Sequence, residues 1–429
     1  MPLPDVDLNS LAASATKLKK QYRDFQAQQL KLDMTRGKPC AEQLDLANPL
    51  LSILDQSDYL DASGVDCRNY GVLDGISEAK TLFADYLQVS TDELFIGGNS
   101  SLGLMHDLVA RCISHGAADS EQPWAKLEKI KFLCPAPGYD RHFAICQHFS
   151  IEMISVALLE NGDPDMEHIE RLVASDASIK GLWFVPKYGN PSGLSVSDQA
   201  VDRLAKMPCA AADFRIFWDN AYNVHHLTPQ HVEIKNLLRA CQQAGNDNRA
   251  FVIGSTSKIS FAGAGIAALG ASRDNINWLC QHVAIQTIGS DKINQLRHLR
   301  FFKNLQGIKD HMLKHSEILA PKFQTVDRVL NAQLSGKHLA QWSKPKGGYF
   351  INLDVLDNCA TKVVAMARDA GVVLTAAGAT FPYGKDPRDR NIRIAPSLPS
   401  VEQIELAMQI LSVCIELVSI EVLSDKQKT

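Results

Sequence analysis

The chain has 429 residues, of which 45% are hydrophobic and 21% are charged, and it carries a formal net charge of −4. This length allows two or three domains with a large buried core, and the composition excludes a chain that is mainly disordered. The slightly acidic balance also argues against a nucleic-acid-binding protein, which usually shows a clustered excess of basic residues.

The same sequence predicts a soluble, cytoplasmic protein. Its most apolar stretch, residues 411–423, is interrupted by Glu416 and Glu421, so we expect no membrane-spanning helix. The N-terminal segment MPLPDVDLNS lacks the apolar core of a signal peptide. The ten cysteines form no CxxC pair and lie mostly in apolar surroundings, so we expect structural thiols rather than a metal site or disulfides.

In chain order, the patterns begin with an amphipathic helix over residues 10–31. From about residue 75 to 310, apolar strand-like runs alternate with helical patterns, which is typical of an α/β domain with a mostly parallel sheet. A helix over 309–330, two strand-like runs and further helices then predict a smaller α+β domain. We therefore expect an N-terminal arm and part of the small domain in residues 1–50, a large domain in 51–310 and a small domain in 311–429.

Five of the strand-like runs end in polar or Gly/Pro-rich segments. ELFI is followed by Gly97 to Ser101, KFLC by Pro135 to Tyr139, GLWFV by Pro186 to Gly193, RIFW by Asp219 to Tyr222, and AFVI by Gly254 to Lys258. The carboxyl ends of parallel strands line the ligand crevice of an α/β sheet. If these runs are neighbours in one sheet, their polar segments meet in a single site.

Three features of these segments suggest a chemistry, although each also has an ordinary structural explanation. Lys258 would be a nucleophilic amine if burial lowers its pKa, or else a solvated loop lysine. Asp219 would need a cation if buried, or else it caps a helix. Gly98, Asn99 and Ser100 open a helical segment as a phosphate-binding helix start would, although many helices begin with serine.

Together with an aromatic side chain at Tyr139, these groups fit one cofactor. Pyridoxal 5′-phosphate has an aldehyde for a lysine, a ring nitrogen for a carboxylate, a phosphate for a helix start and a flat ring for an aromatic partner. No GxxxxGK[ST] motif is present, which leaves a nucleotide P-loop unsupported.

The order of three short motifs carries a family resemblance. NPSG at Asn190, DNAY at Asp219 and STSK at Lys258 make the chain similar to class I aminotransferases of pyridoxal-phosphate fold type I. TRGKP, YGNPSG and SKISFAGAGIA further resemble the aspartate aminotransferase subgroup related to the catalytic domains of MocR-type regulators.

RNYGVLDG around Tyr70, APGYDRH around Tyr139 and NIRIAPS around Arg393 extend this resemblance to nearly the whole chain. It implies a large domain with a mostly parallel seven-stranded sheet, a smaller α+β domain and a homodimer with shared active sites. The implied reaction is a ping-pong amino transfer, with L-aspartate and 2-oxoglutarate as the expected substrates.

The resemblance also implies roles for residues around the cofactor ring. Lys258 would bind the aldehyde covalently and move a proton, and Asp219 would pair with the ring nitrogen. Asn190 and Tyr222 would bind the phenolic oxygen, and Tyr139 would stack on the ring. His142 matches a histidine that orients the aspartate, with an ordinary buried histidine as the alternative.

For the phosphate, the resemblance implies Ser255, Ser257 and the helix start at Gly98, Asn99 and Ser100, together with Tyr70 from the neighbouring subunit. Many relatives also use an arginine eight residues after the lysine, but this chain has Ile266 there. The phosphate must then rely on hydroxyl groups, the helix N-terminus or a cation from elsewhere.

Arg393 would hold the substrate α-carboxylate in a bidentate fork. A dicarboxylic substrate needs a second cation, for which Arg36, Lys38, Arg141 and Lys292 are candidates, and each is equally explained as a surface charge. Gly37 would let the backbone approach the substrate. Thr287 is a further candidate for a contact across the dimer.

Other interpretations stay open or fail. An aminotransferase for aromatic or kynurenine-like amino acids, a lyase with the same cofactor, and a cofactor-binding regulatory protein without catalysis are the alternatives. His311 and His315 have the i, i+4 spacing of a metal pair, but HMLKH lacks the glutamate of HExxH. We expect no metal site there, and instead a solvated helix face.

Overall fold

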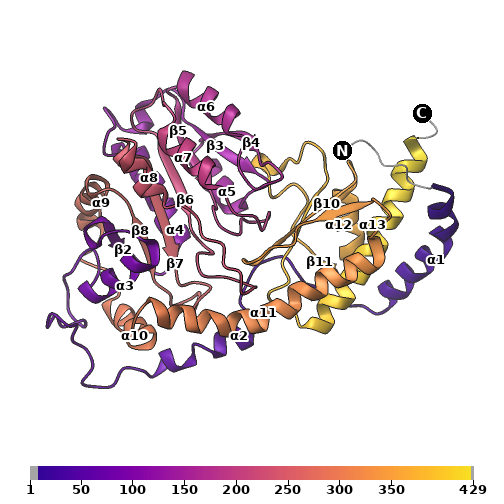
Figure 1. Cartoon of the computed structure of the whole chain (residues 1–429), viewed down its shortest axis with the longest axis horizontal. Helices are drawn as coiled ribbons and strands as arrows, with labels where there is room; N and C mark the ends of the chain where they lie inside the picture. The colour runs from indigo at the N-terminus through magenta and orange to yellow at the C-terminus, as the bar shows by residue number, and fades with distance from the viewer. Residues whose placement is uncertain (1–7, 427–429) are drawn as a thin grey trace.

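The computed structural model describes residues 8–426. In it, the apolar runs of the middle part of the chain form a seven-stranded sheet (Figure 1). Only β8 runs antiparallel to its neighbours, so the predicted mostly parallel sheet is confirmed. The order across the sheet is β2 (Leu94–Ile96), β8 (Ala267–Gly270), β7 (Ala250–Ser255), β6 (Arg215–Asp219), β5 (Ile179–Phe184), β3 (Lys131–Ala136) and β4 (Glu152–Ala157).

Helices cover both faces of this sheet because successive strand residues point to opposite sides. Ile216 belongs to one buried cluster and its neighbour Phe217 to another. The first cluster contains residues of α3 (Ser77–Leu87), α6 (Met166–Ser175), α7 (Asp198–Lys206), α8 (Leu237–Gln243) and α10 (Lys292–Phe302). The second contains residues of α4 (Ser101–His115), α5 (Asp140–His148) and α9 (Arg273–Gln286).

The C-terminal part has a sheet of its own. In it, β10 (Ile351–Val355) lies between β9 (Ala340–Trp342) and β12 (Asn391–Ile394), with antiparallel pairing on both sides. α12 (Ala360–Asp369) and α13 (Val401–Lys426) accompany this sheet, which gives the expected α+β layout. We call this part the small lobe and the part around the seven-stranded sheet the large lobe.

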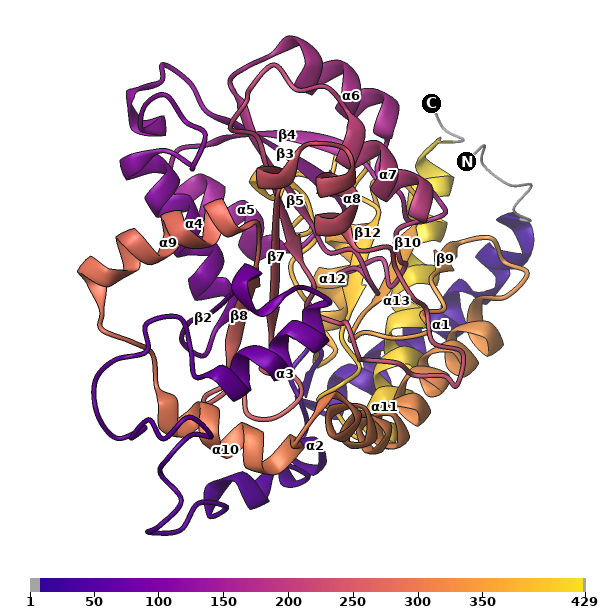
Figure 2. The same ribbon diagram turned by 60° about the vertical axis from the view of Figure 1, so that its left-hand side comes forward.

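The N-terminal segment joins the small lobe. α1 (Leu8–Ala27) lies beside α13 in both views (Figure 1, Figure 2), and β1 (Leu32–Asp33) pairs in parallel with β11 (Val372–Val373). The predicted boundary near residue 310 falls inside α11 (Leu305–Leu334), a long helix that runs from one lobe to the other (Figure 1). The exact division into three segments stays a prediction, and residues 1–7, which include part of the segment considered as a leader, lie outside the described residues.

One helix of the described chain is long and apolar enough to cross a membrane by length and composition alone. It is α13 over Val401–Asp425, and 67% of its most apolar window is buried inside the protein. Glu416 within it is buried and forms an ion pair with Lys337 at 2.7 Å. This burial identifies α13 as a core helix of the small lobe. All ten cysteines are free thiols.

The expectation of a solvated face at His311 and His315 is wrong. Both rings are buried in α11, and their Nε2 atoms lie 3.0 Å apart. His311 Nε2 is 2.8 Å from the carbonyl oxygen of Ile259, and His315 Nδ1 is 2.9 Å from Nε2 of Gln43. The described residues contain no group of three possible metal ligands, so these two histidines are part of a buried polar network.

Candidate active site

A cavity of about 270 Å³ lies at the carboxyl ends of the strands, between the two lobes. The large lobe contributes Tyr139 after β3, Asn190 after β5, and Asp219 and Tyr222 at and after β6, together with Ser257 and Lys258 after β7. The small lobe contributes Arg393 of β12, and the N-terminal segment contributes Arg36 and Gly37. With Lys38 and Arg141, the cavity therefore joins eleven of the residues selected from the sequence.

Lys258 lies in the irregular segment that follows β7, with its Nζ 5.0 Å from the centre of the Tyr222 ring. Burial lowers the pKa of this lysine, and the negative charge of Asp219 opposes that effect. A lowered pKa leaves more of the amine in its neutral, nucleophilic form. The burial of Lys258 therefore favours a nucleophilic lysine over a solvated loop lysine.

Asp219 is the last residue of β6 and is 2% exposed. Its Oδ2 lies 3.1 Å from Nε2 of His142, whereas its Oδ1 is buried without a hydrogen-bond partner among the described residues. The His142 ring is in turn stacked on Trp183, at 4.6 Å between ring centres. A buried carboxylate oxygen without a partner is costly, so this geometry leaves a place for one donor from the cavity side.

The two tyrosines of the cavity lie close enough to this carboxylate for its charge to affect both of their pKa values. Tyr139 precedes α5, and burial raises its pKa to about 12. Burial raises the pKa of Tyr222 well above its usual value, with the charges of Tyr139 and Asp219 adding to the effect. Both phenols are therefore protonated near neutral pH and can donate a hydrogen bond to an oxygen anion bound in the cavity.

Arg393 is 5% exposed and holds a carboxylate of this chain. Its Nη1 donates to Oδ1 of Asp140 at 2.8 Å and to Oδ1 of Asn190 at 3.3 Å, and its Nη2 donates to Oγ1 of Thr375 at 3.1 Å. The guanidinium also lies over the ring of Phe350, 5.0 Å from the ring centre. Sequence reasoning missed Asp140 and Phe350, although both adjoin motif residues.

The proposed phosphate ligands gather near the start of α4, beside the cavity. Ser100 accepts the amide hydrogen of Gly103 as the helix N-cap, and Gly98 has a positive φ of 66° that favours glycine. The hydroxyl groups of Ser255 and Ser257 lie 3.2 Å apart, and that of Ser257 is 3.4 Å from the carbonyl oxygen of Asn99. Of the residues predicted to bind the phosphate, only Ser257 lines this cavity. Ser101 of α4, which was not predicted, lines it too.

Ile266, at the place of the expected arginine, is 2% exposed and packs in the core of the large lobe. Its backbone N–H donates to Oγ1 of Thr256 at 2.9 Å, so the position braces the segment before Lys258. A phosphate in this site would consequently depend on hydroxyl groups and on the N-terminus of α4.

Three of the four candidate cations for a second carboxylate line the cavity: Arg36, Lys38 and Arg141. None of the three forms an ion pair with another described residue. Gly37 between the first two has room for no Cβ, because that atom would lie 2.7 Å from the Phe350 ring. Position 37 must therefore be a glycine, because the small lobe lies close to its backbone.

The remaining candidates lie away from this cavity. Lys292 is buried at the start of α10 and donates from Nζ to the carbonyl oxygen of Gly71 at 2.9 Å. Thr287 donates to the carbonyl oxygen of Gly289 at 3.1 Å. Tyr70 stands in the same region with 82% of its side chain exposed.

Behind Lys258, buried polar groups support its backbone. The carbonyl oxygen of Lys258 lies 3.3 Å from Nε2 of His225 and 3.4 Å from the hydroxyl of Tyr349. Gln43 donates to the same tyrosine at 2.8 Å, and it also contacts His315 of α11. The histidine network described above thereby fixes the position of the lysine segment.

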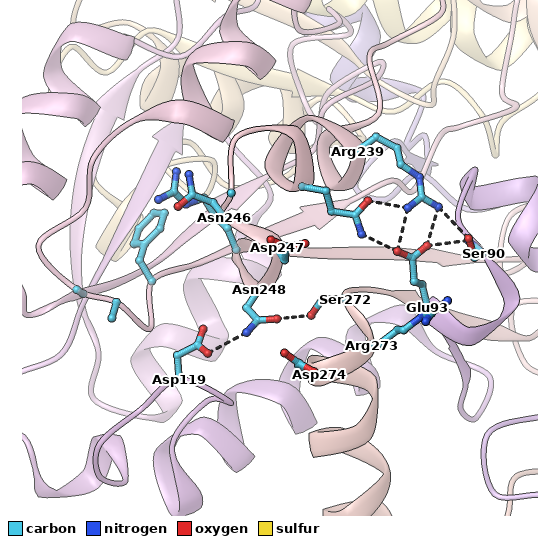
Figure 3. A pocket seen from close by; sticks show the side chains of 16 residues that line it. Ser90, Glu93, Asp119, Arg239, Asn246, Asp247, Asn248, Ser272, Arg273 and Asp274 are labelled. Carbon is cyan, nitrogen blue, oxygen red and sulfur yellow. Dashed lines mark hydrogen bonds and ion pairs between the residues drawn. The ribbon is translucent and has the colours of Figure 1, made fainter.

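A second cavity, of about 720 Å³, opens at the amino ends of β6 and β7, the opposite edge of the sheet (Figure 3). Its polar side chains are largely satisfied by one another: Arg239 binds Glu93, and Asn248 binds both Asp119 and Ser272. It has none of the residues that the sequence analysis selected.

The residues of the first cavity fit pyridoxal 5′-phosphate. The unpartnered Oδ1 of Asp219 would accept the proton of a ring nitrogen, and the lysine with a lowered pKa would meet the aldehyde. The hydroxyl groups beside the N-terminus of α4 would receive the phosphate.

Comparison with known proteins places this geometry in context. The family model for aspartate amino-transferase matches residues 6–427. A protein of Mycolicibacterium smegmatis that is described only generally, as an aminotransferase, is 49% identical over 425 residues, covering 99% of each chain. An aspartate aminotransferase of Corynebacterium glutamicum is 43% identical over 419 residues, covering 98% of this chain and 96% of the relative.

Solved structures agree with these matches. An aspartate transaminase from Corynebacterium glutamicum superposes with a TM-score of 0.95 at 43% identity, covering 98% of this chain and 99% of the other. The α-aminoadipate aminotransferase of Thermus thermophilus, crystallised with N-(5′-phosphopyridoxyl)-L-leucine, superposes with a TM-score of 0.74 at 18% identity, covering 92% and 93%. The second likeness shows the fold alone, which is pyridoxal-phosphate fold type I.

Proposed function

Because the chain belongs to the aspartate aminotransferase family and is a transaminase of amino acids and 2-oxo acids, we propose that it binds pyridoxal 5′-phosphate on Lys258 and uses L-aspartate and 2-oxoglutarate. The products are then oxaloacetate and L-glutamate. The observation that supports this most directly is one cavity in which a lysine of lowered pKa, a carboxylate oxygen without a partner and a buried arginine face one another.

The cofactor supplies an aldehyde that receives the amino group and a ring that spreads negative charge from the substrate Cα. Asp219 holds a proton on the ring nitrogen, and His142, braced by Trp183, keeps that carboxylate in place. Asn190 and Tyr222 would hold the phenolic oxygen by hydrogen bonds, and Tyr139 would stack on the ring. Once its amine is free and neutral, Lys258 takes the proton from the substrate Cα at Nζ.

Recognition of a dicarboxylic substrate follows from the charges of the cavity. Arg393 binds the α-carboxylate, and the cations Arg36, Lys38 and Arg141 also line the cavity. A second carboxylate buried without a cation would cost several kcal/mol, on the order of an unpaired buried ion. This cluster therefore favours L-aspartate over an aromatic amino acid, and we assign Arg36 and Gly37 to the substrate side of the site.

We further propose that the enzyme is a cytoplasmic homodimer with shared sites. Tyr70 is exposed, and Lys292 donates a hydrogen bond to the backbone of the adjoining Gly71. The Tyr70 hydroxyl would then donate a hydrogen bond to the phosphate bound in a partner subunit. Gly98, Asn99, Ser100, Ser255 and Ser257 would bind the same phosphate from within the chain.

A single half-reaction tests the proposed function. Purified enzyme loaded with the cofactor is mixed with L-aspartate in the absence of any 2-oxo acid, and the cofactor absorbance is followed. We expect conversion from the aldehyde form to the amine form, and its reversal when 2-oxoglutarate is added. A loaded enzyme that ignores L-aspartate but converts an aromatic amino acid would refute the substrate assignment.

A further inference from the structure

The ion pair between Arg393 and Asp140 joins the two lobes, and both residues line the cavity. Arg393 belongs to β12 of the small lobe, and Asp140 is the first residue of α5 in the large lobe. The distance of 2.8 Å between Nη1 and Oδ1 is that of a charge-assisted hydrogen bond. A carboxylate of the protein therefore occupies part of the position that the proposed function gives to the α-carboxylate of the substrate.

Asp140 is well suited to be displaced. Its side chain is 34% exposed, whereas that of Arg393 is 5% exposed, so the aspartate has access to water and the arginine does not. Nε of Arg393 is buried without a partner among the residues that the structure describes. The guanidinium thus has an N–H group without an acceptor. A ligand that binds through two oxygens accepts more hydrogen bonds from it than Asp140 does.

Two carboxylates cannot share this arginine without a penalty. Like charges held around one buried cation repel each other, and the water that reaches Asp140 screens only part of this repulsion. The substrate must consequently either replace Asp140 or bind in spite of it.

We propose that Asp140 is a built-in competitor for Arg393, which weakens the binding of every ligand that carries an α-carboxylate. This inference rests on the proposed function, since it takes Arg393 as the α-carboxylate ligand. Asp140 is a positioning residue in this scheme: it acts through Arg393 and contacts no reacting atom.

The competition lowers the affinity for monocarboxylic and dicarboxylic amino acids by the same factor. A monocarboxylic amino acid exchanges one ion pair for another at Arg393 and gains little. A dicarboxylic amino acid makes the same exchange but adds a second ion pair within the group of Arg36, Lys38 and Arg141, which have no ion-pair partner among the described residues. Asp140 therefore leaves the ratio of the two affinities unchanged, and the second ion pair lets a dicarboxylate keep the higher affinity.

The test compares Asp140→Asn with the wild-type holoenzyme. Succinate, which has no amino group, is titrated by calorimetry to give its Kd. The second-order rate constant of the half-reaction is measured for L-aspartate and for L-alanine, because this constant does not require saturation. Asp140→Glu keeps the competing charge, and Glu167→Gln removes an exposed carboxylate on α6 as a matched control.

We expect Asp140→Asn to bind succinate about tenfold more tightly, or about 1.4 kcal/mol. Both rate constants should rise by a similar factor while the saturated rate with L-aspartate stays the same. Asp140→Glu should lie near the wild type, and Glu167→Gln should change nothing. Cofactor absorbance and melting temperature establish that each variant is folded, and Asp140→Ser is a second variant if the asparagine fails to fold.

Two results would overturn the proposal. Weaker or unchanged binding of succinate, with lower or unchanged rate constants, would show that Asp140 only holds Arg393 in place. A gain for L-aspartate without a gain for L-alanine would place Asp140 against the side-chain carboxylate instead. If the wild type fails to convert L-aspartate, the proposed function fails, and the L-alanine comparison still reports on Asp140.

Discussion

The two oxygens of Asp219 have different surroundings, and this difference defines the task of the residue. Oδ2 is held by His142, while Oδ1 faces the cavity without a partner among the described side chains and backbone groups. A charge-assisted hydrogen bond to a protonated ring nitrogen would satisfy that oxygen.

We expect Asp219→Asn to bind the cofactor but to lose about 100-fold in the rate of the half-reaction, because the neutral amide cannot hold the ring proton and loses about 3 kcal/mol of stabilisation. Stopped-flow absorbance measures this rate. Asp219→Glu keeps the charge and should recover part of it. A rate within threefold of the wild type in Asp219→Asn would refute the role.

Lys187 is a second residue whose burial can be tested. Its side chain is 1% exposed, its Nζ donates to the carbonyl oxygen of Asn223 at 2.7 Å, and burial lowers its pKa to about 8. The unfolded chain, with a lysine pKa near 10.4, then binds more protons than the folded chain between these two values. The free energy of unfolding must therefore rise with pH between these two pKa values.

We therefore expect the free energy of unfolding of the wild type to rise relative to Lys187→Met between pH 8 and pH 10, by at most about 3 kcal/mol. Urea unfolding of both holoenzymes at several pH values measures the difference. Lys385→Met, at an exposed position, is the control. Parallel pH profiles for the wild type and Lys187→Met would contradict the lowered pKa.

At the scale of single elements, α11 carries the buried pair His311 and His315. Burial lowers the pKa of both, that of His315 to about 3, and the neighbouring His311 adds to the effect. Below pH 6.5 the two histidines bind protons in the unfolded chain but stay unprotonated in the folded helix. Stability is consequently lost as the pH falls from 6.5 towards 3.

His315→Gln should reduce this loss. A glutamine keeps hydrogen-bonding groups near Gln43 but does not titrate, so the variant should lose about 2 kcal/mol less than the wild type between pH 6.5 and pH 5. Chemical unfolding at the two pH values measures this. His338→Gln, which replaces an exposed histidine after α11, should leave the loss unchanged. An equal loss in His315→Gln and wild type would refute the assignment.

The same helix shows where sequence reasoning stops. The spacing of His311 and His315 establishes that both lie on one face, but nothing local says whether that face meets water or Ile259. The strand ends were predictable because apolar runs stop where polar loops begin, and the topology then gathers them. Asp140 was missed because its partner, Arg393, is 253 positions away and in the other lobe.

At the scale of the whole molecule, the proposed dimer has a direct test in hybrids of two inactive variants. Tyr70 is 82% exposed and does not line the cavity of its own chain, so its proposed phosphate contact requires a second subunit. Each site would then use Lys258 from one subunit and Tyr70 from the other. Lys258→Ala should abolish covalent cofactor binding, and Tyr70→Phe should weaken cofactor retention through the lost hydrogen bond.

In a hybrid with one subunit of each variant, one site carries both defects and the other carries neither. We expect the hybrid, isolated with two different affinity tags, to retain cofactor in one site per dimer and to show about half the wild-type activity at low cofactor concentration. The two parent variants, measured side by side, should show far less under the same conditions, because each of their sites is defective. If Tyr70 instead served its own subunit, the hybrid would have no intact site, since the only subunit with Lys258 would lack the hydroxyl. Hybrid activity no higher than the mean of the two parents would therefore reject the shared site while leaving the role of Lys258 in its own chain intact.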